Sequence, residues 1–125
     1  MEQVVYGGYR WNQKTSTHLQ DSMFLESYGY KVYSQNDEDG ILQEIFDRIG
    51  TETKKFVEFG VQDGLECNSH YLLHKGWTGL WLEGSEPFYR QIQEKFASVI
   101  ADGKLKTDNA FITRENINAL LDRNG

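Results

Sequence analysis

The chain has 125 residues, of which 38% are hydrophobic and 14% aromatic, with a single proline and a formal net charge of −6. That length suits one small domain, and the composition is typical of a globular rather than a disordered protein. The basic residues form no block, so we expect neither nucleic acid nor an anionic membrane surface as a partner. No apolar run approaches the ~20 residues of a membrane span, and no signal pattern opens the sequence. One cysteine makes no internal disulfide, which favours a cytoplasmic location.

The first half of the chain predicts an arm followed by a helix. Residues 1–33 are rich in Tyr, Gly, Ser, Thr and Gln without a sustained hydrophobic period, and we interpret them as an N-terminal arm or cap. A short helix is expected within Gln20–Tyr28. In the segment 34–50, acidic residues at the start suit the positive end of a helix dipole, and the apolar residues form one stripe. That stripe consists of Ile41, Leu42, Ile45, Phe46 and Ile49. We expect this helix to pack on a sheet.

The central stretch, 55–85, predicts a strand, a glycine turn, a helix with a glycine stop, and a second strand. The first strand is expected to be buried and ends in a turn that contains Gly60 and Gly64, where the backbone is free to turn sharply. The second strand, 79–82, is followed directly by Glu83. A β-α-β unit with a glycine-bearing turn and an acid about 20 positions later predicts the nucleotide-binding half of a Rossmann-like fold. The apolar residues of the first strand are Phe56, Val57 and Phe59.

The remaining sequence continues the alternation of helices and strands. It predicts a helix over 86–101, a strand over 104–112 and a last helix that is capped by residues 113–116 and ends at Leu121. Parallel strands joined by helical crossovers follow from this alternation. Three strands leave the first strand at an edge of the sheet, and its apolar side chains favour pairing with something else. We therefore expect residues 34–125 to be the N-terminal part of a larger domain, or a homo-oligomer that covers this edge.

The residues around the first turn indicate the kind of cofactor. Glu58 lies two positions before Gly60, and Gln62 stands where a dinucleotide motif would carry its middle glycine. A carboxylate at this place would repel a pyrophosphate, so S-adenosylmethionine, with its sulfonium and ammonium groups, fits better than NAD. Glu83, at the end of the second strand, is able to accept hydrogen bonds from both ribose hydroxyls of an adenosine cofactor.

Other polar and aromatic residues of the central stretch carry weaker signals. His70 and His74 are four positions apart on the expected helix, a spacing that places two ligands on one face. Because there is neither an H-E-x-x-H glutamate nor a cysteine pair, no metal site is expected, and His70 is interpreted as a packing or hydrogen-bonding residue. Cys67 is expected to be a buried small residue, and Trp77 and Trp81 core or interface aromatics.

Four segments together resemble the FkbM-type branch of class I S-adenosylmethionine-dependent methyltransferases: YSQNDEDGILQEIF, FVEFGVQDGLECNSHYLL, GLWLEGSEPF and NAFITRENIN. The likeness covers roughly residues 33–121. It implies an α/β protein with a Rossmann-like three-layer αβα methyltransferase fold, whose strand order is 3-2-1-4-5-7-6 when complete. The fold is expected to be truncated here after the third parallel strand. Members of the family are typically O-methyltransferases that act on sugar or natural-product hydroxyls.

The resemblance also implies which residues bind the cofactor. Gln35 and Asp39 match a Ser-Gln…Asp segment that helps to close the methionine end of the pocket. Residues 109–113 lie where adenine contacts usually arise, and Asn109 is taken as the expected contact. The acidic segment after a fourth strand, near the methyl acceptor, has no counterpart, so no catalytic residue is assigned. The complete set of expected cofactor-binding residues is Glu58, Gly60, Gln62, Gly64, Glu83, Gln35, Asp39 and Asn109.

The favoured function is therefore an S-adenosylmethionine-dependent methyltransferase for a hydroxyl of a small molecule or glycan, with this chain supplying the cofactor-binding half. The alternative is a catalytically inactive Rossmann-like binding or interaction module, because a fold is able to persist without its chemistry. A nucleotide-sugar or NAD enzyme is disfavoured by Glu58 and by the missing G-x-G pattern.

Overall fold

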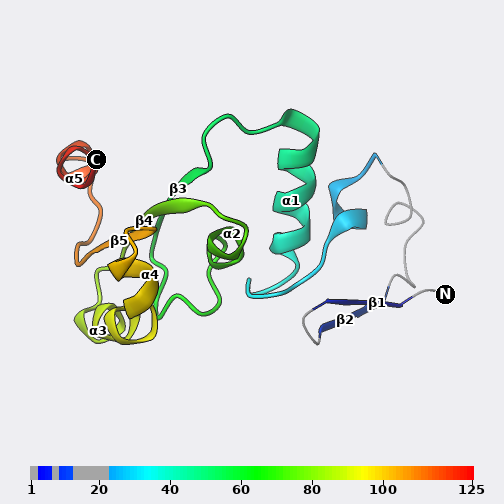
Figure 1. Ribbon diagram of the computed structural model, residues 1–125, viewed down its shortest axis with the longest axis horizontal. Coiled ribbons are helices and arrows are strands. Elements are labelled where there is room, and N and C mark those ends of the chain that lie inside the picture. The colour runs from blue at the N-terminus through cyan, green and yellow to red at the C-terminus, as the bar shows by residue number, and fades with distance from the viewer. Residues whose placement is uncertain (1–2, 7–8, 13–22) are drawn as a thin grey trace. The chain divides into compact units, whose positions relative to one another are not determined.

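A computed structural model describes residues 3–6, 9–12 and 23–125 (Figure 1). The chain forms two compact units, Met1–Thr53 and Lys54–Gly125. The boundary between the two units lies after Thr53, whereas the sequence analysis places the boundary between an N-terminal arm and the domain after residue 33.

The first unit holds a hairpin, a 3-10 helix and one α-helix. Their bounds are β1 Gln3–Tyr6, β2 Tyr9–Asn12, η2 Leu25–Tyr28 and α1 Glu38–Ile49. The two strands pair antiparallel with Tyr6 opposite Tyr9, an element that the sequence analysis missed. Helix α1 confirms the helix expected in this segment, and it packs against η2. Of the short helix expected within Gln20–Tyr28, residues 20–22 lie outside the described residues, and η2 forms its end.

The second unit is a three-stranded parallel sheet with helices. Its elements are β3 Lys55–Phe59, α2 His70–His74, β4 Thr78–Leu82, α3 Glu86–Lys95, α4 Ala97–Ala101, β5 Leu105–Asp108 and α5 Ile117–Asn124. The strand order is β3-β4-β5, and Leu80 of β4 lies opposite Val57 on one side and Lys106 on the other. This arrangement confirms the α/β class with the first strand at an edge. It is compatible with a Rossmann-like fold.

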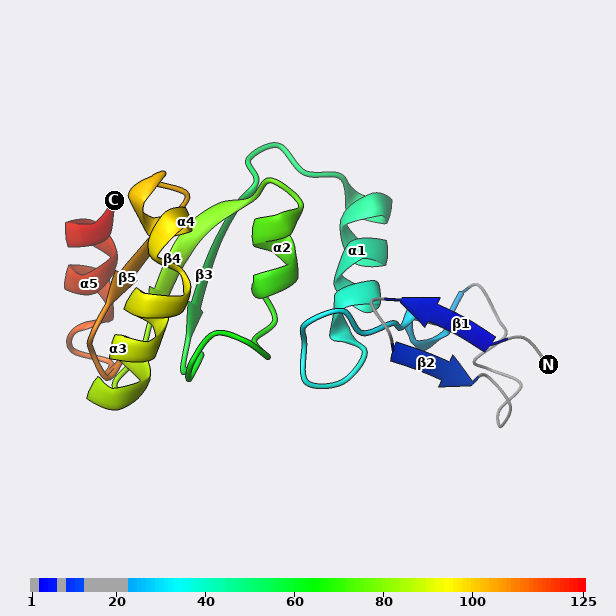
Figure 2. The same cartoon turned by 60° about the horizontal axis from the view of Figure 1, so that its bottom comes forward.

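The core of the second unit lies on one face of the sheet, under α2, α3 and α4. Figure 2 shows α3 and α4 beside the strands, and Figure 1 shows α5 apart from these two helices. Because laterally paired residues of a sheet share a face, Lys106 and Asp108 lie on the face opposite Trp81. There they bind α5: Lys106 Nζ donates to the Asn124 carbonyl at 2.6 Å, and Arg123 pairs with Asp108. The buried cluster consists of Val61, Cys67, Trp81, Ile92, Phe96 and Leu105.

Strand β3 is more exposed than the sequence predicts. Val57 is 52% and Phe59 62% exposed, so the expectation of a buried strand is wrong for these two side chains. The physical reason is that β3 pairs on one side only, at the edge of the sheet, whereas α5, which lies on the same face as these side chains, is bound through Lys106 and Asp108 of the other edge strand, β5.

The bounds of the later elements also differ from those expected. The single helix expected over 86–101 is interrupted at Phe96, whose ring packs edge-on against Trp81 with 4.8 Å between centroids. Strand β5 is shorter than the segment expected. Helix α5 begins at Ile117, directly after the expected cap, and continues beyond Leu121 to Asn124. None of the helices in the described part of the chain has the length and apolar character needed to cross a membrane.

Candidate functional site

The turn after β3 is built from three residues with left-handed backbone. Gly60, Gln62 and Gly64 have φ angles of 69°, 56° and 80°. A Cβ atom on Gly64 would overlap the ring of Trp81, so this glycine permits close packing of the turn on β4. A Cβ atom on Gly60 would meet nothing within 4 Å. The surface over Gly60 is therefore open to a ligand, and glycine leaves the backbone accessible there.

Glu83 joins this turn to the end of β4. Its side chain is buried, with the residue only 6% exposed. Oε2 accepts a hydrogen bond from the Gln62 N–H at 2.7 Å, and Oε1 accepts one from the Ser85 N–H at 2.9 Å. A carboxylate has about four acceptor positions, so these two backbone donors leave capacity for further hydrogen bonds.

Asn109, in the segment after β5, is hydrogen-bonded to the backbone of Glu83 at the end of β4. Its Nδ2 donates to the Glu83 carbonyl at 2.8 Å, and the Ala110 N–H donates to the same oxygen at 3.1 Å. The structure thus brings the turn, Glu83 and Asn109 together at the carboxyl ends of β3 and β4. In open parallel sheets, ligands bind at this edge.

Glu58 has structural partners that the sequence does not reveal. Its carboxylate accepts hydrogen bonds from the N–H groups of Asn68 at 3.1 Å and Ser69 at 2.8 Å. The Ser69 hydroxyl also donates to Glu58 and in turn accepts from Trp81 Nε1 at 2.7 Å. A negative charge next to the first turn of α2 suits the helix dipole. Glu58 therefore connects β3 to the start of α2 and, through Ser69, to the core.

Phe111 is a candidate site residue that the sequence analysis did not single out. It is 75% exposed, and its ring lies so close to Gly84 that a Cβ atom on that glycine would overlap it. It lies beyond the end of β5, inside the segment 109–113 that the resemblance associates with adenine contacts, and its aromatic side chain is the signal that singles it out within that segment.

Gln35 and Asp39 belong to the first unit, unlike the other six predicted residues. Asp39 is fully buried, and its Oδ2 accepts hydrogen bonds from three successive backbone N–H groups at 2.7–2.9 Å. Its Oδ1 is buried without a hydrogen-bond partner among the described residues. Gln35 is exposed, and its carbonyl accepts from Lys31 Nζ at 3.4 Å. Asp39 thus holds the segment before α1 in place; the three donors are Val32, Tyr33 and Ser34.

Cys67 is not a nucleophile at neutral pH. Its side chain is buried, with Sγ 3.4 Å from the Gly64 carbonyl. Burial, together with the negative charge of Glu58, raises the pKa of Cys67 to about 12. Since the thiolate is the reactive form, the thiol is inert, as expected for a packing residue. Trp77 and Trp81 are buried, which confirms their assignment to the core.

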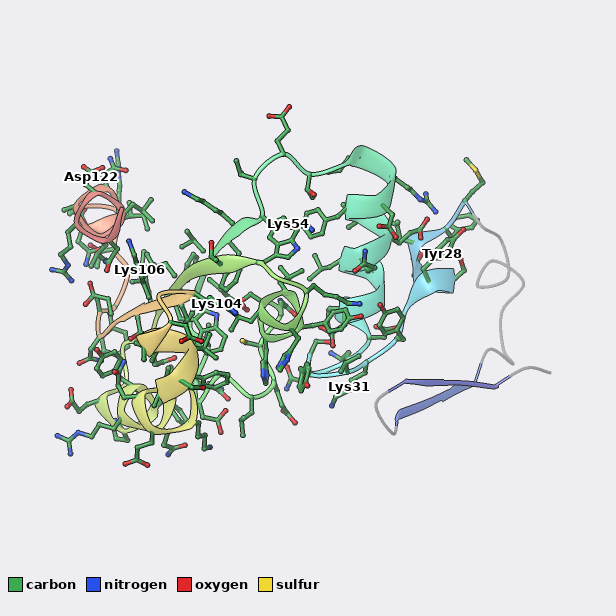
Figure 3. The ribbon with its side chains drawn as sticks, viewed as in Figure 1. Tyr28, Lys31, Lys54, Lys104, Lys106 and Asp122 are labelled. Carbon is green, nitrogen blue, oxygen red and sulfur yellow. The ribbon has the colours of Figure 1, made fainter. Side chains whose placement is uncertain are left out.

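A cavity of about 320 Å³ lies at the amino-terminal ends of the strands, away from the turn. Its lining includes Phe56, Leu80 and Leu121, together with Lys104 and Lys106, which are labelled in Figure 3. None of the predicted cofactor-binding residues lines it, so this cavity is not the predicted site.

The candidate site is therefore the open glycine turn with Glu83, Asn109 and the exposed ring of Phe111, all in the second unit. Comparison with protein-family models, with curated proteins and with solved structures finds no match to the chain.

Proposed function

We propose that the chain carries the cofactor-binding half of an S-adenosylmethionine-dependent methyltransferase that acts on a sugar or natural-product hydroxyl. The observation that carries the proposal is the open left-handed turn at Gly60, hydrogen-bonded through Gln62 to the buried carboxylate of Glu83. These groups lie at the carboxyl ends of two adjacent parallel strands, where such sheets bind ligands.

The residues at this edge suit an adenosine cofactor that has no phosphate. Glu83 keeps acceptor capacity for ribose hydroxyls, and the exposed ring of Phe111 offers an apolar surface for adenine. The carboxylates of Glu58 and Glu83 disfavour a pyrophosphate and favour a cationic ligand. The bound cofactor would supply the electrophilic methyl group, while these residues hold it in position for attack by the acceptor oxygen.

The proposal is tested by calorimetric titration of S-adenosylhomocysteine into the wild-type chain and a Gly60→Asn variant. Asparagine tolerates the left-handed backbone and places a side chain in the open space over the turn. We expect binding that weakens at least tenfold, about 1.4 kcal/mol, in the variant.

The matched control is Gly103→Asn. Gly103 has a φ of 75°, and a Cβ atom there also meets nothing within 4 Å, but it lies near the amino-terminal end of β5. This variant should bind S-adenosylhomocysteine as the wild type does. Equal weakening by both substitutions would contradict the proposed site, and NAD binding of comparable affinity would contradict the charge argument.

The second candidate function is a catalytically inactive binding or interaction module. It is favoured by the hydrogen bonds from backbone amides to both Glu58 and Glu83, which give each carboxylate a structural role without any ligand. It is also favoured by the exposed Val57 and Phe59 on the edge strand. A folded chain that binds no S-adenosylhomocysteine would select this reading over the methyltransferase.

A further inference from the structure

The imidazole rings of His70 and His74 face each other on one side of α2. Their Nε2 atoms lie 3.3 Å apart, and their ring centroids 5.1 Å apart. Two nitrogen ligands at about 2.0–2.1 Å from a tetrahedral zinc ion are separated by about 3.3–3.4 Å. The two nitrogen atoms therefore already have the separation of neighbouring ligands in a zinc site.

The surroundings of His70 orient its Nε2 for metal binding. Its Nδ1 lies 3.1 Å from the Leu65 carbonyl oxygen, which is only an acceptor, so the ring proton is assigned to Nδ1 and Nε2 presents its lone pair. The ring also packs edge-on against Phe96, with 5.1 Å between centroids. A ligating histidine in proteins is usually held in this way, by a hydrogen bond from its other ring nitrogen to a carbonyl or carboxylate.

His74 completes the pair from the exposed side of the helix. Without metal, the 3.3 Å contact is read as a hydrogen bond from His74 Nε2–H to His70 Nε2. When a metal binds, His74 takes the other neutral tautomer, with its proton on Nδ1, and both Nε2 lone pairs point to the ion.

We propose that His70 and His74 form a zinc site, to which each contributes its Nε2 atom as a ligand. A zinc site is independent of the proposed function. It also revises the expectation from sequence that the chain has no metal site. The described residues indeed contain no cluster of three or more His, Cys, Asp and Glu side chains suited to a metal. Imidazole nitrogen suits zinc, whereas magnesium and calcium prefer oxygen ligands.

The test is calorimetric titration of zinc chloride into the whole chain in a non-chelating buffer at neutral pH. We expect one zinc ion per chain and at least tenfold weaker binding in His74→Ala. His74 is the residue to change because its side chain is exposed, whereas His70 is buried against Phe96 and its loss would disturb the core. The control is Lys75→Ala, which truncates the exposed residue that directly follows His74 and should leave zinc binding unchanged.

A second readout tests the coordination itself. Cobalt(II) in a tetrahedral site absorbs visible light far more strongly than hydrated cobalt, so the wild type should develop such a spectrum and His74→Ala should not. Zinc should also raise the melting temperature of the wild type but not of His74→Ala, because a ligand that binds the native state stabilises it. Absence of zinc binding by the wild type, or equal binding by His74→Ala, would overturn the proposal whatever the result with S-adenosylhomocysteine.

Discussion

At the scale of single residues, Gln62 occupies a backbone conformation that glycine adopts more easily. Its φ is 56°, which costs a residue with a Cβ atom roughly 1–2 kcal/mol. Gln62→Gly removes that strain but adds roughly 0.5–1 kcal/mol of backbone entropy to the unfolded chain. We therefore expect the free energy of unfolding in urea to rise by up to about 1 kcal/mol. The control, Gln91→Gly inside α3, should lower it by about 1 kcal/mol, and an equal loss in both variants would refute the argument.

The thiol of Cys67 gives a second test at this scale. With its pKa raised to about 12 by burial, almost no thiolate is present at pH 8. We expect iodoacetamide to modify the native chain at least tenfold more slowly than the chain unfolded in guanidinium chloride, measured by mass spectrometry. Equal rates in the two states would mean that Cys67 is accessible and ionised, against its burial beside the glycine turn.

Part of the candidate site could be predicted at this scale and part could not. The turn and Glu83 were found because their positions relative to the strands are local features of the sequence. The hydrogen-bond partners of Glu58 could not be predicted, because the backbone amides that donate to its carboxylate lie ten and eleven positions away along the chain. The place of Phe111 over Gly84 likewise depends on how the segment after β5 folds back.

At the scale of elements, the start of α2 depends on the contacts of one serine. The Ser69 hydroxyl accepts from the buried indole of Trp81 and donates to Glu58. Ser69→Ala leaves the Trp81 Nε1–H without its partner, and we expect a loss of about 1–3 kcal/mol in the free energy of unfolding. Ser98→Ala, at an exposed position of α4, should change it by less than about 0.5 kcal/mol. A similarly small effect at Ser69 would show that the connection between Trp81 and Glu58 contributes little.

The ion pair between Asp63 and Lys95, at 3.1 Å, connects the glycine turn to α3. Burial raises the pKa of Asp63, but the hydrogen bonds from the Leu65 N–H and from Lys95 outweigh it, so the pKa lies below its usual value. The stabilisation is therefore present above the usual carboxyl pKa of about 3.9 and is lost as the pH falls through the lowered value.

The free energy of unfolding falls between neutral and acid pH, and we expect this fall to be smaller in Asp63→Asn than in the wild type. The difference should be less than about 1 kcal/mol, because both side chains of the ion pair are partly exposed. Denaturant titrations at a series of pH values measure this. An unchanged pH dependence in Asp63→Asn would show that the pair is not formed in solution.

The elements that were predicted correctly depend on local signals, and those that were missed depend on packing. Strand β4 and helix α2 follow from an apolar run and a glycine stop, both readable from neighbouring residues. The interruption occurs at Phe96, whose ring contacts Trp81, a residue distant in sequence. The hairpin of β1 and β2 has a signal in the sequence, since the pair Gly7-Gly8 separates the paired residues Tyr6 and Tyr9, and such a glycine pair is typical of a two-residue hairpin loop.

At the scale of the whole molecule, the open edge of β3 bears on self-association. In the described sheet, β3 pairs only with β4, and its exposed face carries Val57 and Phe59, at 52% and 62% exposure. An apolar edge strand readily pairs with another chain, so we propose that copies of this chain associate through β3. The sequence predicts only that the edge of the first strand is covered. The structure adds that Val57 and Phe59 are the apolar side chains exposed there.

The corresponding prediction concerns a variant that carries both Val57→Lys and Phe59→Lys. Lysines on the exposed face of an edge strand oppose pairing by repulsion and by the cost of removing their charge from water. In sedimentation equilibrium, we expect the wild type to associate with increasing concentration and the variant to do so at least tenfold more weakly. The control is Ile49→Lys at the end of α1, which removes a 73% exposed apolar side chain from the first unit. A wild type that stays monomeric, or an equal effect of Ile49→Lys, would show that the edge of β3 is not the surface through which copies meet.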